Sequence, residues 1–164
     1  MESIPITVEG FKKMRNELEE LKKERPAVIQ AIKEAREEGD LRENAGYEAA
    51  RERQGMLEAR INKLESRLPR CDVLDIHSMQ GDKIAFGATV RIEDLDTGET
   101  KQFTLLGPDE ADYNTGSISV HSPLAQAMLG KEVGDEVVVH APKGRIDYEI
   151  ISVEYKGFPE NHKF

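Results

Sequence analysis

The sequence predicts an α+β protein, with an N-terminal antiparallel α-helical coiled-coil hairpin followed by an antiparallel sheet domain that carries one short helix. Apolar residues recur at alternating spacings of three and four over two long stretches before about residue 70, which is the heptad pattern of coiled coils. Residues 39–44 interrupt this pattern, and short strand-like segments separated by turns begin after residue 80. We therefore expect a hairpin over residues 1–75, a sheet domain over residues 76–156 and a mobile tail over residues 157–164.

The two heptad stretches form the predicted arms of the hairpin. Arms of about 25 to 30 residues span roughly 40 Å at 1.5 Å per residue, so the connection between them lies far from the base. That connection is short, which forces the helices to run antiparallel. Arg25 occupies one position of the first apolar seam. The apolar seam of the first arm contains Phe11, Met14, Leu18, Leu21, Val28, Ile32 and Ala35, and the seam of the second contains Tyr47, Ala50, Gln54, Leu57, Ile61, Leu64 and Leu68.

Start and stop signals set the limits of the first arm. Thr7 is a suitable N-cap, with Glu9 in the first turn, where the helix dipole favours an acid. Gly39 suits the left-handed position that commonly ends a helix. Pro26 lies inside the pattern and removes one backbone hydrogen bond, so we expect a bend near Arg25.

Charge divides the chain into the same two parts. Residues 1–70 contain 15 Lys and Arg and 15 Asp and Glu, whereas residues 71–164 contain 8 and 17, so the net charge of −9 lies in the second part. No apolar run approaches the roughly 20 residues of a membrane span, and the N-terminus lacks a signal-peptide core. We expect a cytoplasmic protein. The single cysteine, Cys71, excludes an internal disulfide and is interpreted as an unreactive thiol.

The second part reads as strands and turns. Residues 83–92 resemble a strand with a glycine break, residues 96–98 a turn, and residues 100–105 the returning strand. Ser122 followed by Pro123 is an N-cap with proline at the first helical position, and Gly130 ends the short helix predicted over residues 124–129. Residues 137–139 and 145–150, separated by a turn at 142–144, are the last two predicted strands.

The sequence lacks recognisable motifs for a metal site, a phosphate-binding loop or a catalytic nucleophile. The four histidines at positions 77, 121, 140 and 162 lack the spacing of a metal site. Gly134 and Gly144 lie in turns and not in a phosphate-binding loop. No serine, cysteine or lysine lies in a recognisable nucleophile motif.

Asp40 and Glu43, between the two arms, are the exception. A structural interpretation is available, because acids before a helix are stabilised by its dipole and can cap it. A functional interpretation is that the pair supplies part of a Mg²⁺ site. Two carboxylates cannot complete the octahedral oxygen shell of Mg²⁺, so the remaining ligands would have to come from a partner.

The sequence resembles the GreA/GreB family of bacterial transcript cleavage factors over about residues 1–156. The matching blocks are residues 4–7, 34–45, 86–90, 118–120 with 122–123, and 153–155. The resemblance implies that the second domain is FKBP-like. It also implies binding to RNA polymerase, with the hairpin in the secondary channel of the enzyme and the sheet domain on the channel rim.

The resemblance also implies roles for individual residues. Asp40 and Glu43 match the acidic pair that helps the polymerase cleave the 3′ end of backtracked nascent RNA, with Mg²⁺ held jointly by factor and polymerase. Arg36 and Arg51 match basic positions, and we predict that they contact RNA. Ser122 and Pro123 match a segment implicated in docking on the polymerase.

Each arginine is equally compatible with a solvated helix face. We expect a monomer that is not itself the enzyme, because the polymerase active site performs the hydrolysis.

Two other functions stay open. The sheet domain could be a prolyl isomerase, although no aromatic proline pocket is recognisable in residues 80–155. Alternatively, the hairpin could be a binding module, or an inhibitor that occupies the polymerase channel without stimulating cleavage.

Overall fold

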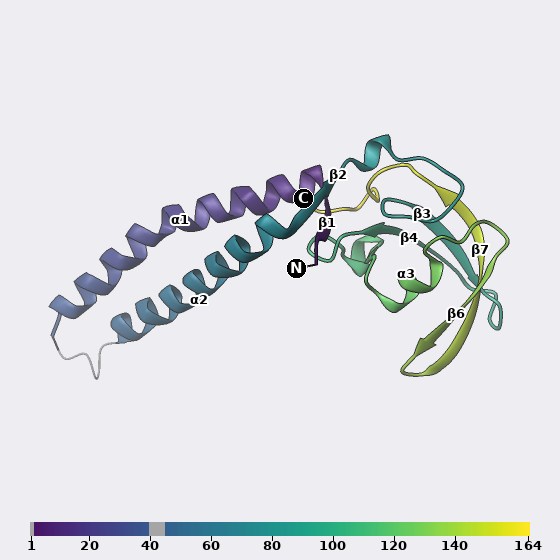
Figure 1. The fold of residues 1–164 in the computed structure, drawn as a ribbon. Helices are drawn as coiled ribbons and strands as arrows, with labels where there is room; N and C mark the ends of the chain where they lie inside the picture. Colours follow the sequence, from purple (N-terminus) through teal and green to yellow (C-terminus); the bar gives the residue numbers. More distant parts are fainter. Residues whose placement is uncertain (1, 40–44) are drawn as a thin grey trace. The chain divides into compact units, whose positions relative to one another are not determined.

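The computed structural model describes residues 2–39 and 45–164, which divide into two compact units (Figure 1). The hairpin unit comprises residues 11–71 with the first residues of the chain, and the sheet unit comprises residues 3–10 and 72–164. The division at residue 71 is close to the predicted boundary at residue 75. The prediction did not place residues 3–10 in the second unit, because their partners there are more than 60 residues away in the sequence.

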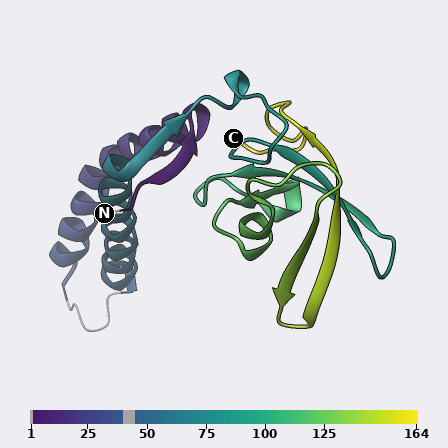
Figure 2. The ribbon, with the colours of Figure 1, turned by 45° about the vertical axis from the view of Figure 1, so that its right-hand side comes forward.

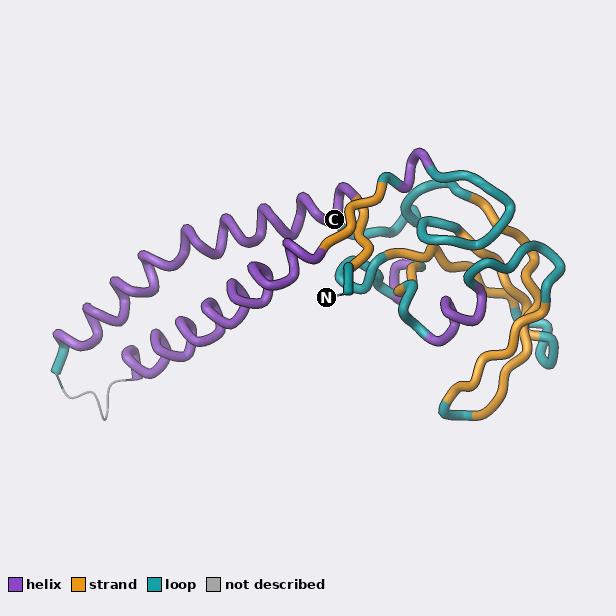
Figure 3. The backbone as a smooth tube through the Cα atoms, viewed as in Figure 1, coloured by secondary structure: helices purple, strands orange, loops and turns teal. Residues whose placement is uncertain are grey.

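The hairpin unit consists of two long helices that lie side by side (Figures 1 and 3). Helix α1 spans Val8–Glu37 and helix α2 spans Ala45–Arg67. Their facing surfaces form the predicted apolar seam, in which Val28, Ile32, Leu57 and Ile61 make a cluster of buried residues. The predicted coiled-coil hairpin is therefore confirmed for the described residues.

Ion pairs between the helices flank this seam. Arg25 donates to the Glu58 carboxylate at 2.7 and 2.9 Å, and Arg60 donates to Glu17 at 2.8 and 2.9 Å. The hydrogen bond from Arg60 lowers the pKa of Glu17 below its ordinary value. Arg25, predicted to occupy a seam position, instead reaches across the hairpin to Glu58. These two-point contacts hold the helices in register, although partly exposed pairs contribute little net stability.

The predicted start of α1 is confirmed. The Gly10 N–H donates to Thr7 Oγ1 at 2.9 Å, so Thr7 is the N-cap, and Glu9 lies in the first turn. Gly39 has a φ of 120°, in the region that favours glycine. Helix α1 continues through Pro26.

The sheet unit is built on five strands in the order β5-β4-β3-β7-β6. The long hairpin of β6 and β7 is drawn in yellow-green and yellow in Figure 2. The neighbours β4–β3, β3–β7 and β7–β6 are antiparallel, whereas β4 and β5 are parallel. The predicted antiparallel sheet is thus mixed, because the loop after β4 returns the chain to the level of Thr104, where β5 begins and runs in the same direction as β4. The strands are β3 Thr89–Asp94, β4 Thr100–Leu106, β5 Ser117–Ser119, β6 Glu136–Ala141 and β7 Gly144–Glu154.

Several shorter elements were not predicted. Strands β1 (Ile4–Thr7) and β2 (Cys71–Leu74) form a separate two-stranded sheet. Three 3-10 turns, η1 Leu68–Arg70, η2 Ile76–Ser78 and η3 Tyr113–Thr115, connect other elements. Residues 83–88, predicted as the first half of a strand, are irregular and contain a turn at residues 86–87, where the Ala88 N–H bonds back to the Ala85 carbonyl.

The core of the sheet unit lies between the sheet and helix α3, Pro123–Met128. Ile92, Leu105 and Ile150 from three neighbouring strands are almost completely buried, as is Met128 of the helix. No helix within residues 2–39 or 45–164 combines the length and apolar character needed to cross a membrane.

The C-terminal segment after β7 has no regular secondary structure, but it packs on the sheet unit. Phe158 contacts the apolar core and lies edge-on to His77, with ring centroids 6.0 Å apart. Its ring also stacks on His162 at 4.6 Å. The prediction of a mobile tail did not anticipate these contacts.

Candidate functional site

The acidic residues Asp40 and Glu43 lie in the sequence between the end of α1 at Glu37 and the start of α2 at Ala45. Both fall outside the described residues, so their predicted roles stay predictions. The two helices that flank Asp40 and Glu43 in the sequence are joined, in their described parts, by an apolar seam and by interhelical ion pairs.

Arg36 and Arg51, predicted to contact RNA, are brought together by Tyr47. Their guanidinium carbons lie 5.9 and 6.0 Å from the centre of the Tyr47 ring. Arg51 also donates to the Tyr47 hydroxyl at 3.4 Å. The two cations therefore come from different helices and share one aromatic ring, an arrangement favoured by cation–π attraction.

The electrostatic effect of this pairing falls on the tyrosine. Hydrogen bonding to Arg36, together with the positive charges of Arg51 and Arg36, lowers the pKa of Tyr47. Beside these three side chains, a groove of about 430 Å³ is lined by apolar and cationic side chains together with Glu37 and Gln54. It is lined by Ile29, Ile32, Lys33, Arg36, Glu37, Arg51 and Gln54. Exposed guanidinium groups beside an apolar surface suit contact with phosphates and stacking on bases.

Arg53, on the same helix as Arg51, is exposed and lines a different groove with Leu21 and Met56. Sequence reasoning had assigned Tyr47 to the apolar seam and missed its contacts with Arg36 and Arg51. The spacing of four between Tyr47 and Arg51 on one helix was the available signal.

Ser122 and Pro123 form the predicted helix start. Ser122 Oγ accepts a hydrogen bond from the Ala125 N–H at 3.2 Å, and Pro123 is the first residue of α3. The Pro123 ring is exposed, while Ala125 and Met128 on the same helix are buried in the core. The pair therefore presents a rigid surface backed by a packed helix.

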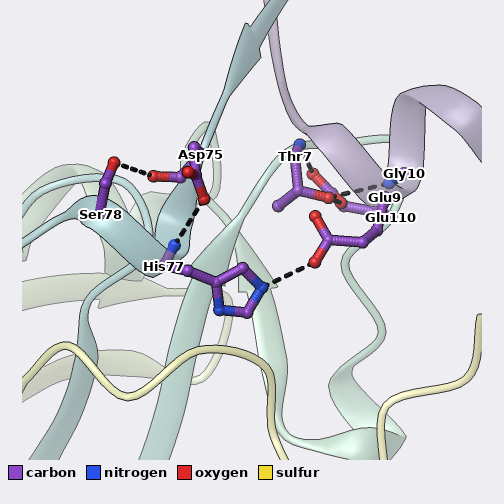
Figure 4. A network of polar contacts seen from close by, with 7 residues as sticks. All are labelled: Thr7, Glu9, Gly10, Asp75, His77, Ser78 and Glu110. Carbon is purple, nitrogen blue, oxygen red and sulfur yellow. Dashed lines mark hydrogen bonds and ion pairs between the residues drawn. The ribbon is translucent and has the colours of Figure 1, made fainter.

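Another polar network, at the base of α1, had no sequence signal (Figure 4). Glu110 accepts hydrogen bonds from Thr7 N–H at 2.9 Å, Thr7 Oγ1 at 2.5 Å and Gly107 N–H at 3.2 Å. Burial raises the pKa of Glu110 despite these donors. Nearby, Glu9 Oε2 lies 2.7 Å from His77 Nε2.

Within residues 2–39 and 45–164, no group of three or more histidine, cysteine, aspartate or glutamate side chains is placed to hold a metal ion. The donor set proposed for Mg²⁺ consists of Asp40 and Glu43. Carboxylate oxygens are suitable ligands for this ion, but two carboxylates leave its six-oxygen shell incomplete.

Two protein-family models together match nearly the whole chain. The description "Transcription elongation factor, N-terminal" matches residues 4–73. The description "Transcription elongation factor, GreA/GreB, C-term" matches residues 79–155. The two matches correspond closely to the hairpin unit and the sheet unit, apart from residues 3–10, which belong to the sheet unit.

Individual proteins are similar over the same length. Transcription elongation factor GreA of Nitratidesulfovibrio vulgaris strain DP4 is 69% identical over 157 residues, which cover 96% of each chain. Transcription elongation factor GreA of Thermodesulfovibrio yellowstonii is 51% identical over 93% of this chain and 98% of its own. Among solved structures, GreA factor homolog 1 of Thermus thermophilus is 29% identical over 93% of this chain and 99% of its own, with a TM-score of 0.43.

Proposed function

Because the chain belongs to the GreA/GreB family of transcription elongation factors, we propose that it enters the secondary channel of RNA polymerase and stimulates cleavage of backtracked RNA. The polymerase is its partner, and the polymerase active site performs the hydrolysis. Removal of the extruded 3′ end returns an arrested complex to elongation. The factor is proposed to act as a monomer in the cytoplasm.

The observation that carries this proposal is the helical hairpin with Asp40 and Glu43 in its connection. Helix α1 has 30 residues and α2 has 23, which correspond to about 45 and 35 Å. Such arms suit delivery of the connection into a deep channel. An apolar seam keeps the arms together, and two bidentate ion pairs set their register.

Asp40 and Glu43 are proposed to hold Mg²⁺ jointly with the polymerase. When bound, the ion would supply electrostatic stabilisation to the attacking water oxygen and to the leaving oxygen of the phosphodiester. Asp40 would contribute a carboxylate oxygen to the shared shell, and Glu43 would orient or deprotonate the attacking water. Neither carboxylate alone completes the site, so catalysis depends on delivery of the connection.

The experiment that tests this function uses stalled elongation complexes with RNA labelled at its 5′ end. We expect the protein to shorten the labelled RNA in backtracked complexes and to restore elongation when nucleotides are added. Unchanged RNA length together with slower synthesis would instead identify a channel inhibitor. Unchanged RNA length and unchanged synthesis would identify a binding module without this activity.

Arg36 and Arg51 are expected to contact the extruded RNA. Replacing either with alanine should lower cleavage at subsaturating factor by about three- to tenfold. It should also make the slope of log cleavage rate against log salt concentration shallower by the amount expected for the loss of about one phosphate contact. Arg53→Ala is the matched control, because Arg53 is an exposed arginine of α2 that lies away from Tyr47. Equal losses for Arg51→Ala and Arg53→Ala would contradict a specific RNA contact.

Pro123 is expected to contact the polymerase. Pro123→Ala should weaken binding about three- to tenfold, since it removes exposed contact surface. The helix should persist, because the first helical position needs no backbone hydrogen bond. Competition for polymerase against labelled wild-type protein measures the binding, and thermal melting reports folding. Unchanged competition would exclude Pro123 from the docking surface, and His140→Ala, an exposed change on β6, is the control.

A further inference from the structure

The first turn of helix α1 is held by side chains of the sheet unit. Residues 3–10, which include this turn, belong to the sheet unit, whereas the same helix continues through the hairpin unit to Glu37. We call the contacts around Thr7 and Gly10 the root of α1 (Figure 4).

Thr7 connects the helix start to Glu110. The Thr7 hydroxyl accepts the Gly10 N–H at 2.9 Å and donates its own proton to Glu110 Oε1 at 2.5 Å. The Thr7 N–H donates to the other carboxylate oxygen of Glu110 at 2.9 Å. Thr7 is completely buried, so these bonds are shielded from competing water and a lost partner would be costly.

Glu110 is itself fixed by the turn that follows β4. Its carboxylate accepts the Gly107 N–H at 3.2 Å, and its own N–H bonds to the Gly107 carbonyl at 3.2 Å. A Cβ on Gly107 would overlap the carbonyl oxygen of Pro5, and a Cβ on Gly10 would lie 2.5 Å from Glu110 Oε1. The absence of side chains at Gly10 and Gly107 lets residues 5–10 approach the turn that follows β4 closely.

A second contact holds the other side of the root. Glu9 Oε2 lies 2.7 Å from His77 Nε2, and the 3-10 turn that carries His77 is capped by Asp75, which accepts the His77 N–H at 3.0 Å. Because His77 is exposed, this pair contributes less than the buried Glu110 contacts. Glu110 is therefore the principal anchor.

The length of α1 amplifies any movement at its root. Thirty residues correspond to about 45 Å, so a rotation of about 5° displaces the far end by about 4 Å. Misplacement of a catalytic group by about 1 Å can reduce a rate about 100-fold. Firm anchoring of the root is therefore important for any reaction that depends on groups carried beyond Glu37.

We propose that Glu110 is a positioning residue for stimulated RNA cleavage, which it supports by holding the first turn of α1 through Thr7. This inference rests on the proposed function of Asp40 and Glu43. Glu110 touches neither RNA nor the reacting atoms. Its contribution is to hold the start of the helix that leads along the chain to Asp40 and Glu43.

The test compares Glu110→Ala with Glu99→Ala, which removes an exposed acid from the same unit. Glu110→Ala should lower the cleavage rate at saturating factor about tenfold, while the half-saturating concentration changes less than about twofold. Glu99→Ala should leave both unchanged. A folded Glu110→Ala protein with the wild-type maximal rate, or with a change confined to half-saturation, would overturn the proposal.

A distance measurement on the free protein separates this inference from the proposed function. Spin labels at Glu48→Cys and Asp96→Cys, in a Cys71→Ser background, would report one position in each unit by double electron–electron resonance. Glu110→Ala should broaden the distance distribution, and an unchanged distribution would overturn the anchoring even if cleavage fell. Failure of the wild-type protein to cleave RNA would refute the proposed function and leave this measurement decisive for the anchor.

Substitutions at Thr7 keep the proposal testable if Glu110→Ala does not fold. Thr7→Val removes the hydroxyl that joins Gly10 to Glu110 but retains the backbone bond to Glu110. It should broaden the distribution and lower the maximal rate, whereas Thr7→Ser, which restores the hydroxyl, should recover both. Equal behaviour of the valine and serine variants would contradict the anchoring role.

Discussion

Replacing Asp40 with Asn and Glu43 with Gln in one chain is expected to reduce stimulated RNA cleavage at least about 100-fold, the usual scale for loss of a general acid–base group. The variant should still bind the polymerase, because the replacements keep the size of both side chains and leave the proposed docking residue Pro123 unchanged. Cleavage of 5′-labelled RNA in stalled complexes, with competition binding measured in parallel, checks both parts.

Magnesium separates the catalytic from the structural interpretation of the acids. If Asp40 supplies an oxygen to a weakly held ion, Asp40→Asn alone should be partly rescued by raised Mg²⁺. If the acids only favour the start of a helix, the double variant should lose a few tenths of a kcal/mol in stability and cleave normally. Normal cleavage by the double variant at limiting Mg²⁺ would exclude the pair from catalysis.

Ile61→Asp is expected to unfold the hairpin and abolish cleavage, while the sheet unit remains folded. Ile61 is completely buried in the seam with Val28, Ile32 and Leu57. An unpaired carboxylate in this apolar cluster should destabilise the helix pair by about 3 kcal/mol or more. Far-UV circular dichroism should lose most of its helical signal, because α1 and α2 are far longer than the six-residue α3.

The same variant tests the division of labour between the units. If the sheet unit docks on the polymerase, Ile61→Asp protein should still compete with wild-type factor and thereby inhibit its cleavage. Met56→Asp, which places the same charge on α2 at a side chain that is 70% exposed, is the matched control and should behave like wild type. Loss of competition by a variant whose sheet unit is still folded would assign docking to the hairpin.

Local patterns in the sequence predicted the elements that present the candidate site. The three-and-four spacing predicts the seam that contains Val28 and Ile61, because helix periodicity depends on neighbouring residues alone. The N-cap at Thr7 and the Ser122–Pro123 helix start were equally readable, since each satisfies backbone groups within three residues. The resemblance of residues 34–45 to a known family identified Asp40 and Glu43, which periodicity alone left open to a capping role.

The tertiary structure decided which distant side chains meet. Glu110 lies 103 residues from Thr7 and His77 lies 68 residues from Glu9, so no local pattern relates them. The parallel pairing of β5 with β4 likewise depends on the path of the intervening loop. Arg25 occupies the heptad position of a seam residue, but its guanidinium forms an ion pair with Glu58 on the facing helix. By itself, the sequence determined the two helical arms, their ends and the residues carried between them. Packing of residues 3–10 against the turn that follows β4 determined how the first turn of α1 is anchored. Side-chain hydrogen bonds and close backbone approach of this kind arise only between surfaces that the complete fold brings together.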